Sequence, residues 1–230
     1  MSFQGKTVFV TGSTRGIGKG IAEKFHALGG RVIINSRSDW SPSKPFFEDT
    51  LFFRADLSKD SSVESLRRFS DEKIDRLDVL VLNVGSGRSV PPGEETPEEW
   101  RRVIDINLFS ATNTLCALKD KILSSRTSIV FVSSICGLKA LGAPITYSAA
   151  KAAINSLVAG YALAWGKYGV RVNGVAPGNI LFEGSVWDKK LKEDNAGVKK
   201  MLKAKVPLKT LGKVEDVADA VEYLASERSG

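Results

Sequence analysis

The stretch Thr7-Val-Phe-Val-Thr11-Gly12-Ser-Thr-Arg-Gly16-Ile-Gly18 decides the fold of this chain of 230 residues. Its first five residues are apolar or β-branched, which favours a buried β-strand. After Gly18, apolar residues recur at helical spacing as far as Leu28, and Gly29-Gly30 ends the helix. The sequence therefore predicts a strand, a glycine-rich turn and a helix. Such a turn lets backbone amides approach a phosphate group at the positive end of the helix.

A second strand, Arg31-Val-Ile-Ile-Asn35, completes a βαβ unit whose connection should be right-handed. In dinucleotide-binding folds, a carboxylate about 20 residues after the glycines binds the ribose 2′-hydroxyl and indicates NAD. Here the strand runs into Ser36-Arg37, and Arg37 together with Arg15 could pair with a 2′-phosphate. This pattern favours NADPH over NADH. Asp39 argues the other way, although it lies beyond the expected position.

Apolar runs and amphipathic stretches alternate along the rest of the chain. They predict one α/β domain over residues 1–230, a Rossmann-like, doubly wound parallel sheet with strand order 3-2-1-4-5-6. Ser38 to Thr50 contains Pro42 and Pro45, and we expect a loop there in place of the usual helix. The other expected strands are 51–55, 77–82, 128–133 and 170–175, and the other expected helices are 62–73, 96–123, 146–167 and 214–226.

The composition is ordinary for a soluble globular protein, with 43% hydrophobic and 26% charged residues. No apolar run reaches the roughly 18 residues of a membrane span, and the first residues are too few and too polar for a signal peptide. Cys116 and Cys136 form no CxxC motif and indicate reduced thiols, so we expect a cytoplasmic protein. His26 is the only histidine, which argues against a Ser-His-Asp triad, and no metal is expected.

The net charge of +7 is concentrated in one segment. Between Ser185 and Lys213, nine lysines stand against three acidic residues, which accounts for six of the seven net charges. The segment lacks the interleaved aromatics and reader motifs of nucleic-acid-binding proteins. It could be a solvated helical face. Our preferred interpretation is a substrate lid at about 180–213 that receives an acidic substrate or partner.

Tyr147 and Lys151 are predicted to lie one turn apart on the same face of a helix. A tyrosine whose pKa has its ordinary value near ~10 exchanges protons poorly at neutral pH. A nearby ammonium would lower this pKa, so that the phenol could exchange a proton with a substrate oxygen. The same pair is common on ordinary helix surfaces, so the interpretation depends on the surrounding motifs.

Five motifs, in order, resemble those of the classical short-chain dehydrogenase/reductases, and the resemblance runs from Lys6 to Ala225. Thr11-Gly12-x3-Gly16-Ile17-Gly18 resembles the cofactor motif of that family, whose glycine spacing differs from GxGxxG. Asn83-Val84-Gly85 resembles its Asn-Ala-Gly turn, and Pro177-Gly178 resembles the loop beneath the nicotinamide. Tyr147-x3-Lys151 resembles the active-site signature. Asn107, and Ser134 thirteen residues before Tyr147, match the positions of the catalytic asparagine and serine.

The resemblance implies a role for each catalytic candidate. Ser134 would bind the substrate carbonyl and stabilise the developing charge on its oxygen. Tyr147 would deliver a proton as the nicotinamide delivers hydride, and Lys151 would lower the pKa of Tyr147 and hold the nicotinamide ribose. Asn107 would position a water that relays protons to Lys151. The implied cofactor-binding residues are Gly12, Ser13, Thr14, Arg15, Gly16, Ile17, Gly18, Ser36, Arg37, Asp56, Leu57, Asn83, Val84, Gly85, Tyr147, Lys151, Pro177, Gly178 and Ile180.

The chain departs from the family pattern in three places. Phe182 replaces a threonine near the nicotinamide amide and cannot make that hydrogen bond. The helix expected within 38–50 is missing. The usual last strand is absent, so the strand 170–175 has an open edge; either the chain is truncated or a partner covers that edge. The helices 96–123 and 146–167 resemble those that join subunits in the family, and we expect a homodimer or homotetramer.

We therefore expect an NADPH-dependent oxidoreductase that reduces a ketone to a secondary alcohol, with Tyr147 as general acid. The general resemblance is greatest to 3-oxoacyl carrier-protein reductases, so the substrate is a small molecule or is linked to an acidic carrier. Neither nucleic acid nor membrane is an expected partner. The alternative is a nucleotide-binding regulatory module with weak or no catalysis. Phe182 and the absent last strand favour it, whereas the intact catalytic residues oppose it.

Overall fold

The computed structural model describes residues 2–39 and 50–230. The first half contains β1 (Thr7–Val10), α1 (Gly16–Ala27), β2 (Arg31–Ser36), β3 (Leu51–Arg54), α2 (Ser61–Lys73), β4 (Val79–Leu82) and α3 (Pro97–Ile104). The second half contains α4 (Ser110–Ser125), β5 (Ser128–Val132), α5 (Ile145–Trp165), β6 (Arg171–Val175), α6 (Val186–Glu193), α7 (Asn195–Lys205) and α8 (Val214–Ala225). Most of the loop predicted at 38–50 lies outside the described residues.

The six strands form one parallel sheet in the order β3-β2-β1-β4-β5-β6. β1 lies near the middle, where Val8 is in register with Val32 of β2 and with Val79 of β4. This arrangement confirms the predicted fold class and strand order. Since all strands run the same way, their carboxyl ends meet at one edge of the sheet, and the segments that follow them are brought together there.

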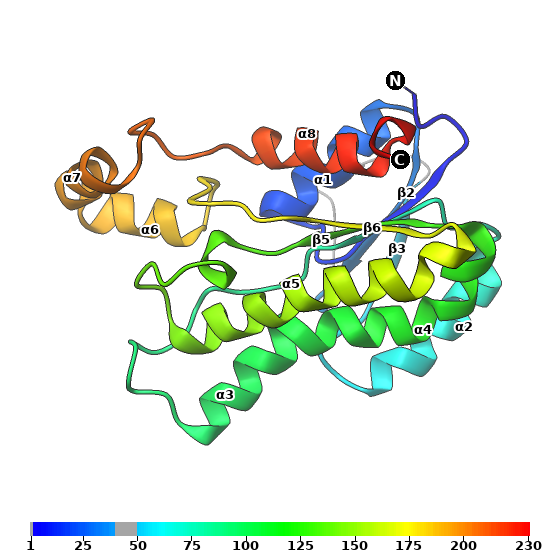
Figure 1. Ribbon diagram of the computed structural model, residues 1–230, viewed down its shortest axis with the longest axis horizontal. Helices are drawn as coiled ribbons and strands as arrows, with labels where there is room; N and C mark the ends of the chain where they lie inside the picture. Colours follow the sequence, from blue (N-terminus) through cyan, green and yellow to red (C-terminus); the bar gives the residue numbers. More distant parts are fainter. Residues whose placement is uncertain (1, 40–49) are drawn as a thin grey trace.

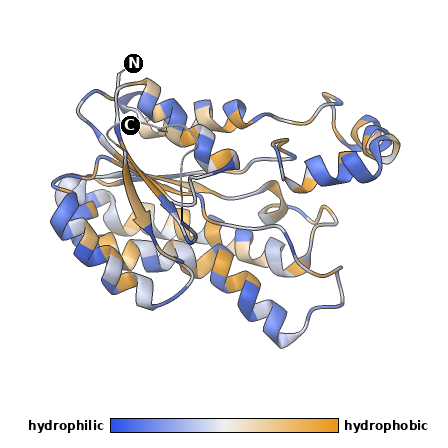
Figure 2. Ribbon diagram, turned by 180° about the vertical axis from the view of Figure 1, so that it is seen from behind, coloured by the Kyte–Doolittle hydropathy of each residue, from blue (hydrophilic) through white to orange (hydrophobic). Residues whose placement is uncertain are grey.

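Helices cover both faces of the sheet, with α1 and α8 on one side and α2, α4 and α5 on the other (Figure 1). Alternate residues of each strand serve the two layers. Val8 and Val10 pack with Phe25 of α1 and Val221 of α8, whereas Phe9 packs with the helices opposite. Burial on both faces explains why the strands read as continuous apolar runs. They are the most hydrophobic part of the fold in Figure 2.

The helix predicted over 96–123 is interrupted. Thr96 caps α3 by accepting a hydrogen bond from the Glu99 amide at 3.2 Å, as its sequence pattern predicts. Residues Asp105–Phe109 then form a π-helical turn before α4 begins. Asn107 lies in this turn, and its side-chain amide donates to the carbonyl of Val103, four residues earlier. A side chain that takes this carbonyl competes with the regular helical hydrogen bond, which accounts for the interruption.

The lysine-rich segment forms two helices, α6 and α7, that project beyond the sheet (Figure 1). Ser185 caps α6 and Asp194 caps α7. The segment is closed at its base, because Ile180 and Gly212 form a parallel bridge and the Leu181 amide donates to the Gly212 carbonyl at 2.9 Å. We call residues 182–211, which lie beyond this bridge, the lid. Its helices are mainly hydrophilic in Figure 2.

Candidate active site

The glycine-rich turn between β1 and α1 fits a bound phosphate. Gly12 and Gly16 have φ angles of +61° and +55°, which other residues adopt only with strain. A side chain on Gly18 would collide with the Gly12 carbonyl and with the amide of Asn83. Helix α1 has no side-chain cap and no acidic residue in its first turn. Its amides are therefore suited to an anion such as the diphosphate of a dinucleotide.

Buried polar side chains hold this turn in place. Asn83, at the end of β4, donates from its side chain to the carbonyls of Thr11 at 3.0 Å and Gly12 at 3.1 Å. Asn35, at the end of β2, accepts from the Gly12 amide and donates to the carbonyls of Phe53 and Ala55. The sequence identifies Asn35 only as the last residue of the second strand and indicates no role for its side chain. The structure gives it a positioning role, because its side chain joins β2, β3 and the turn.

Ser13 and Leu57 are two cofactor candidates whose side chains are buried. The Ser13 hydroxyl donates to the Val10 carbonyl at 2.6 Å and accepts from the Asn35 amide at 3.0 Å. Leu57 is 2% exposed, and its neighbour Asp56 accepts hydrogen bonds from the backbone and hydroxyl of Ser58. The side chains of Ser13 and Leu57 thus shape the site from within, whereas Thr14 is half-buried and Arg15 is exposed.

The end of β2 carries the residues predicted to recognise the adenosine ribose. Ser36 is half-buried and Arg37 is exposed. Asp39 forms an ion pair with Arg54 of β3, with 2.5 Å between Oδ1 and Nη1. In the described part of the chain, neither Arg15 nor Arg37 forms an ion pair with a carboxylate. The cationic side chains of Arg15 and Arg37 are therefore available beside the end of β2.

Ser134 and Ser133, two adjacent buried serines after β5, have different partners. The Ser133 hydroxyl lies 2.6 Å from Oδ1 of Asn155 and 3.2 Å from the carbonyl of Lys151, so it ties β5 to α5. The Ser134 hydroxyl accepts from the Cys136 amide at 3.2 Å and is hydrogen-bonded to the Tyr147 hydroxyl. Only Ser134 is therefore directed at the phenol.

The structure reverses the predicted direction of the Tyr147 pKa. Burial raises this pKa above its ordinary value, the Ser134 hydrogen bond opposes the shift, and Cys136 adds to it. The prediction of a phenol made acidic by Lys151 was wrong for this arrangement, because the lysine is directed elsewhere. Its Nζ lies 5.8 Å from the centre of the Tyr147 ring and donates to the Val132 carbonyl at 2.8 Å. Tyr147 is therefore a neutral phenol at neutral pH.

Lys151 is buried beneath the site, and burial lowers its pKa from 10.5 to about 8. A side chain on Gly137 would lie 2.7 Å from the Lys151 carbonyl, so only glycine lets the turn after β5 pack this closely on α5. A side chain on Gly85 would meet both Lys151 Nζ, at 3.2 Å, and Asn107 Oδ1, at 2.8 Å. The turn after β4 therefore passes directly over these two polar groups.

Asn107 reaches the same place from the π-helical turn. Its side-chain amide donates to the Ser86 carbonyl at 3.1 Å, and its oxygen accepts from the Ser86 amide at 3.0 Å. It is 1% exposed, so these hydrogen bonds are made in the interior of the protein. The structure thus brings together all four catalytic candidates, Asn107, Ser134, Tyr147 and Lys151.

A second polar network beside the site has no clear signal in the sequence. The Ser89 hydroxyl donates to Glu99 at 2.7 Å and lies 2.8 Å from the hydroxyl of Thr146, next to Tyr147. Arg102 binds both carboxylate oxygens of Glu99. Together with the Ser89 hydrogen bond, this contact holds the pKa of Glu99 down to about 2. The network fixes the segment between β4 and α3 to the start of α5.

The loop that contains Pro177 and Gly178, predicted to lie beneath the nicotinamide, follows β6 at the same edge. The Pro177 carbonyl accepts from the Ile135 amide at 3.1 Å, and a side chain on Gly178 would lie 3.5 Å from Cδ1 of Ile135. Ile180 forms the bridge at the base of the lid. The other cofactor candidates, Ile17 and Val84, are half-buried beside the glycine-rich turn, where Val84 packs against Gly12.

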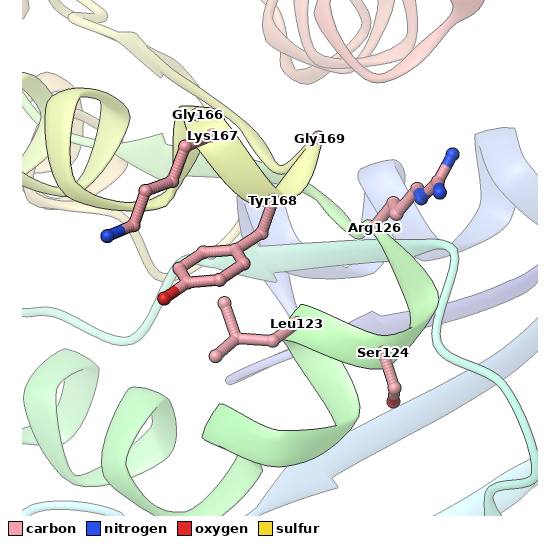
Figure 3. Close-up of a pocket in the computed structure, with 7 residues that line it drawn as sticks. All are labelled: Leu123, Ser124, Arg126, Gly166, Lys167, Tyr168 and Gly169. Atoms are coloured by element: carbon pink, nitrogen blue, oxygen red, sulfur yellow. The ribbon is translucent and has the colours of Figure 1, made fainter.

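A surface hollow of about 650 Å³ lies elsewhere, at the opposite edge of the sheet (Figure 3). It is formed by the end of α4 and the turn after α5, and its lining includes Leu123, Arg126 and Tyr168. Arg126 and Lys167 point away from each other there. Since Tyr147 begins α5 and this hollow follows its end, the two are separated by roughly 30 Å of helix. None of the catalytic candidates lines it.

Neither a membrane-spanning helix nor a metal-binding cluster is present among the described residues. No helix within 2–39 and 50–230 is both long and apolar enough to cross a membrane. Within the same ranges, no three His, Cys, Asp or Glu side chains gather closely enough to hold a metal ion. Cys116 and Cys136 are both free thiols.

Comparison with known proteins identifies the family. A family profile described as "Enoyl-(Acyl carrier protein) reductase" matches residues 12–230. The crystal structure of an oxidoreductase of the short-chain dehydrogenase/reductase family from Burkholderia thailandensis is 29% identical, with a TM-score of 0.83, and the match covers 97% of this chain and 86% of that one. This chain is a short-chain dehydrogenase/reductase. Family membership implies a nicotinamide cofactor and a small-molecule substrate.

Relatives of this short-chain dehydrogenase/reductase differ in their substrates. Glucose 1-dehydrogenase 2 of Bacillus subtilis is 34% identical over 235 residues, 98% of this chain and 89% of that protein. The "Granaticin polyketide synthase putative ketoacyl reductase 2" of Streptomyces violaceoruber is 34% identical over 219 residues, 92% of this chain and 86% of that protein. A crystal structure titled gox2181 has a TM-score of 0.89 at 26% identity, covering 99% of this chain and 91% of that one.

Proposed function

We propose that the protein reduces a ketone to a secondary alcohol with NADPH, and that Tyr147 is the general acid. The observation that carries this proposal is the contact between the half-buried Tyr147 and the buried Ser134, in which removal from water raises the pKa of the phenol. A neutral phenol hydrogen-bonded to a second hydroxyl can give a proton to an oxygen placed between them. Reduction of a carbonyl needs a donor at that oxygen.

Each residue has a defined task in this mechanism. A nicotinamide cofactor, when held by the glycine-rich turn, would supply the hydride that the carbonyl carbon accepts. The Ser134 hydroxyl donates a hydrogen bond to the carbonyl oxygen and stabilises the charge that develops on it. Tyr147 donates its proton to the same oxygen. The positive charge of Lys151 stabilises the resulting phenolate. Asn107, fixed by its two hydrogen bonds to Ser86, positions the water that relays protons to Lys151.

NADPH is the proposed cofactor because of the charges at the end of β2. The pairing of Asp39 with Arg54 removes the carboxylate that would otherwise suit an unphosphorylated ribose. Arg37, exposed at the end of the strand, and Arg15, exposed in the glycine-rich turn, are left to attract a 2′-phosphate. Glycines 12, 16 and 18 and the uncapped start of α1 would receive the diphosphate.

The cofactor preference is tested by titrating the protein with NADPH and NADH. Arg37→Ala should narrow the difference between the two affinities by removing a charge–phosphate contact, worth a factor of about 10 or more. Arg31→Ala is the matched control, because Arg31 is exposed at the other end of the same strand. Equal affinities for NADPH and NADH in the wild-type protein would refute the assignment.

The substrate is proposed to be a 3-oxoacyl group on an acidic carrier or a similarly acidic ketone. All nine lysines between 185 and 213 are exposed. Of these, Lys192 is paired with Asp188 at 2.8 Å, and the others form no ion pair with a described residue. A surface of this charge would attract an anionic partner. The acyl-carrier description of the matching profile and the ketoacyl reductase relative support this choice, whereas the glucose dehydrogenase relative favours a sugar.

A screen of substrates decides between these classes and also tests for catalysis. Wild-type protein would be mixed with NADPH and 3-oxoacyl thioesters, keto-sugars or small ketones, and oxidation of NADPH would be followed by its absorbance. We expect turnover of the 3-oxoacyl thioesters. If the protein binds NADPH but oxidises it with none of these compounds, the alternative of a nucleotide-binding regulatory module replaces the enzyme.

A homodimer or homotetramer in the cytoplasm is part of the same proposal. Helix α5 exposes small residues along one side, and Leu163 near its end is 87% exposed. A flat face with a protruding leucine suits packing against a second copy. Light scattering coupled to gel filtration would measure the mass of the particle. A monomer at micromolar concentration would contradict this part.

A further inference from the structure

We propose that the ring of Phe182 covers the glycine-rich turn and must leave it before the cofactor can bind, so that Phe182 sets the affinity for the dinucleotide. This inference rests on the proposed function only through the nicotinamide cofactor that the family implies. It concerns a residue of the lid that touches the cofactor site and not the substrate.

The contact is close and specific. A side chain built on Gly16 would lie 2.6 Å from Cε2 and 2.8 Å from Cζ of Phe182. The ring therefore rests directly on this glycine, in space that the absence of a side chain leaves open. Gly16 is the first residue of α1 and has a φ of +55°. Phe182 thus lies against the turn from which the helix presents its first amides.

An aromatic ring and a diphosphate cannot share this position. A phosphate bound at a helix start lies about 3 Å from the backbone amides, and it needs the adjacent space for its own oxygens. The ring of Phe182 has no polar atom with which to bind an anion. Contact with Gly16 therefore shields the start of α1 from a phosphate. No side chain caps α1, so the ring of Phe182 is the group that a phosphate would have to displace.

Displacement of the ring would be transmitted to the lid. The Ser185 amide donates to the Phe182 carbonyl at 3.0 Å, and the Ser185 hydroxyl accepts from the Asp188 amide at 3.0 Å as the cap of α6. Behind Phe182, the bridge between Ile180 and Gly212 closes the base. A movement of Phe182 would therefore carry α6 while the base stays fixed.

Cofactor binding to the full chain tests the proposal. NADPH would be titrated into wild-type, Phe182→Ala and Leu181→Ala proteins and followed by calorimetry. If the open form of the turn is a minor state of ~10% or less, truncation of the ring should tighten binding by about 10-fold or more. Leu181→Ala is the matched control, since Leu181 is the exposed neighbour and keeps its backbone hydrogen bond. It should bind like the wild type.

Two further measurements make the result decisive. Phe182→Thr should bind as tightly as Phe182→Ala, and melting without cofactor would show that both variants are folded. Tryptic cleavage of the lid lysines in Phe182→Ala alone should match that of the wild type saturated with NADPH. Unchanged or weaker binding by both variants would overturn the proposal, as would the absence of measurable binding in all of them. Carbonyl reduction is not involved, so failure of the proposed substrate would leave this test unaffected.

Discussion

The carboxyl edge of the sheet and the lid are two neighbouring parts of one site, and they are built in opposite ways. At the sheet edge, the polar groups of Asn107, Ser134 and Lys151 are buried, and each is held by a backbone partner. In the lid, eight lysines are exposed, and the two helices are tied to the rest mainly at the base and at Phe182.

This difference separates two kinds of energetic effect. A buried polar group is costly unless its hydrogen bonds are made, so the geometry of the sheet edge is strongly determined. Exposed charges are screened by water and salt, so single contacts in the lid are weak and the lid can move. We therefore expect large effects on catalysis from the sheet edge and smaller effects on binding from the lid.

Apart from replacement of Tyr147, the largest expected effect comes from separating the two serines after β5. Ser134→Ala should lower kcat/KM by about 10²–10³-fold, because it removes a donor to the developing oxyanion. Ser133→Ala should retain kcat but lose about 1 kcal/mol of stability, because its hydroxyl joins β5 to Asn155 and Lys151. Steady-state kinetics and urea unfolding of both variants check this pair, and equal kinetic losses would break the distinction between them.

A second effect concerns stability and pH. Burial lowers the pKa of Lys151 from 10.5 to about 8 in the folded protein. Between these pH values the unfolded chain keeps a proton that the folded chain has released, so the free energy of unfolding rises with pH. Relative to Lys151→Met, the wild type should gain up to about 3 kcal/mol from pH 8 to pH 10.5.

Urea unfolding at several pH values measures this gain. Lys119→Met is the matched control, since Lys119 is exposed on α4 and its loss should leave the pH dependence unchanged. If the free energy of unfolding has the same pH dependence in the wild type and in Lys151→Met, burial does not lower the pKa of Lys151 in the folded protein.

The smallest expected effect lies in the lid. Replacing Lys199 and Lys203, exposed residues one turn apart on α7, with glutamate should raise KM for an acidic carrier-linked substrate by about 3–10-fold with little change in kcat. The increase should shrink at high salt. Lys119→Glu, with the same charge change away from the lid, is the control. If KM changes neither with the glutamate substitutions nor with the salt concentration, the lid does not attract an acidic partner.

Local patterns in the sequence predicted the sheet, and the resemblance to the family supplied the four catalytic candidates. The strand order follows from apolar strands alternating with helices, and the motif spacings place Asn107, Ser134, Tyr147 and Lys151 after the ends of strands or in the adjoining helices. Since parallel strands end at one edge, these residues had to converge. The glycine-rich turn could be placed at the same edge, because it follows the first strand of the sheet.

Features that depend on side-chain direction could not be predicted from local patterns. The pKa of Tyr147 was expected to fall, but burial raises it, and the Lys151 side chain donates to the Val132 carbonyl instead of approaching the phenol. The contact between Phe182 and Gly16 joins segments far apart in the chain. The π-helical turn at Asn107 depends on which carbonyl its amide selects.

The central claim is that Tyr147 donates the proton to the substrate oxygen, and Tyr147→Phe tests it most directly. With the best substrate of the screen, this variant should lose about 10²–10⁴-fold in kcat while binding NADPH as tightly as the wild type. Tyr168→Phe, an exposed tyrosine beyond the end of α5, should keep full activity. Turnover of Tyr147→Phe at the wild-type rate would contradict the account.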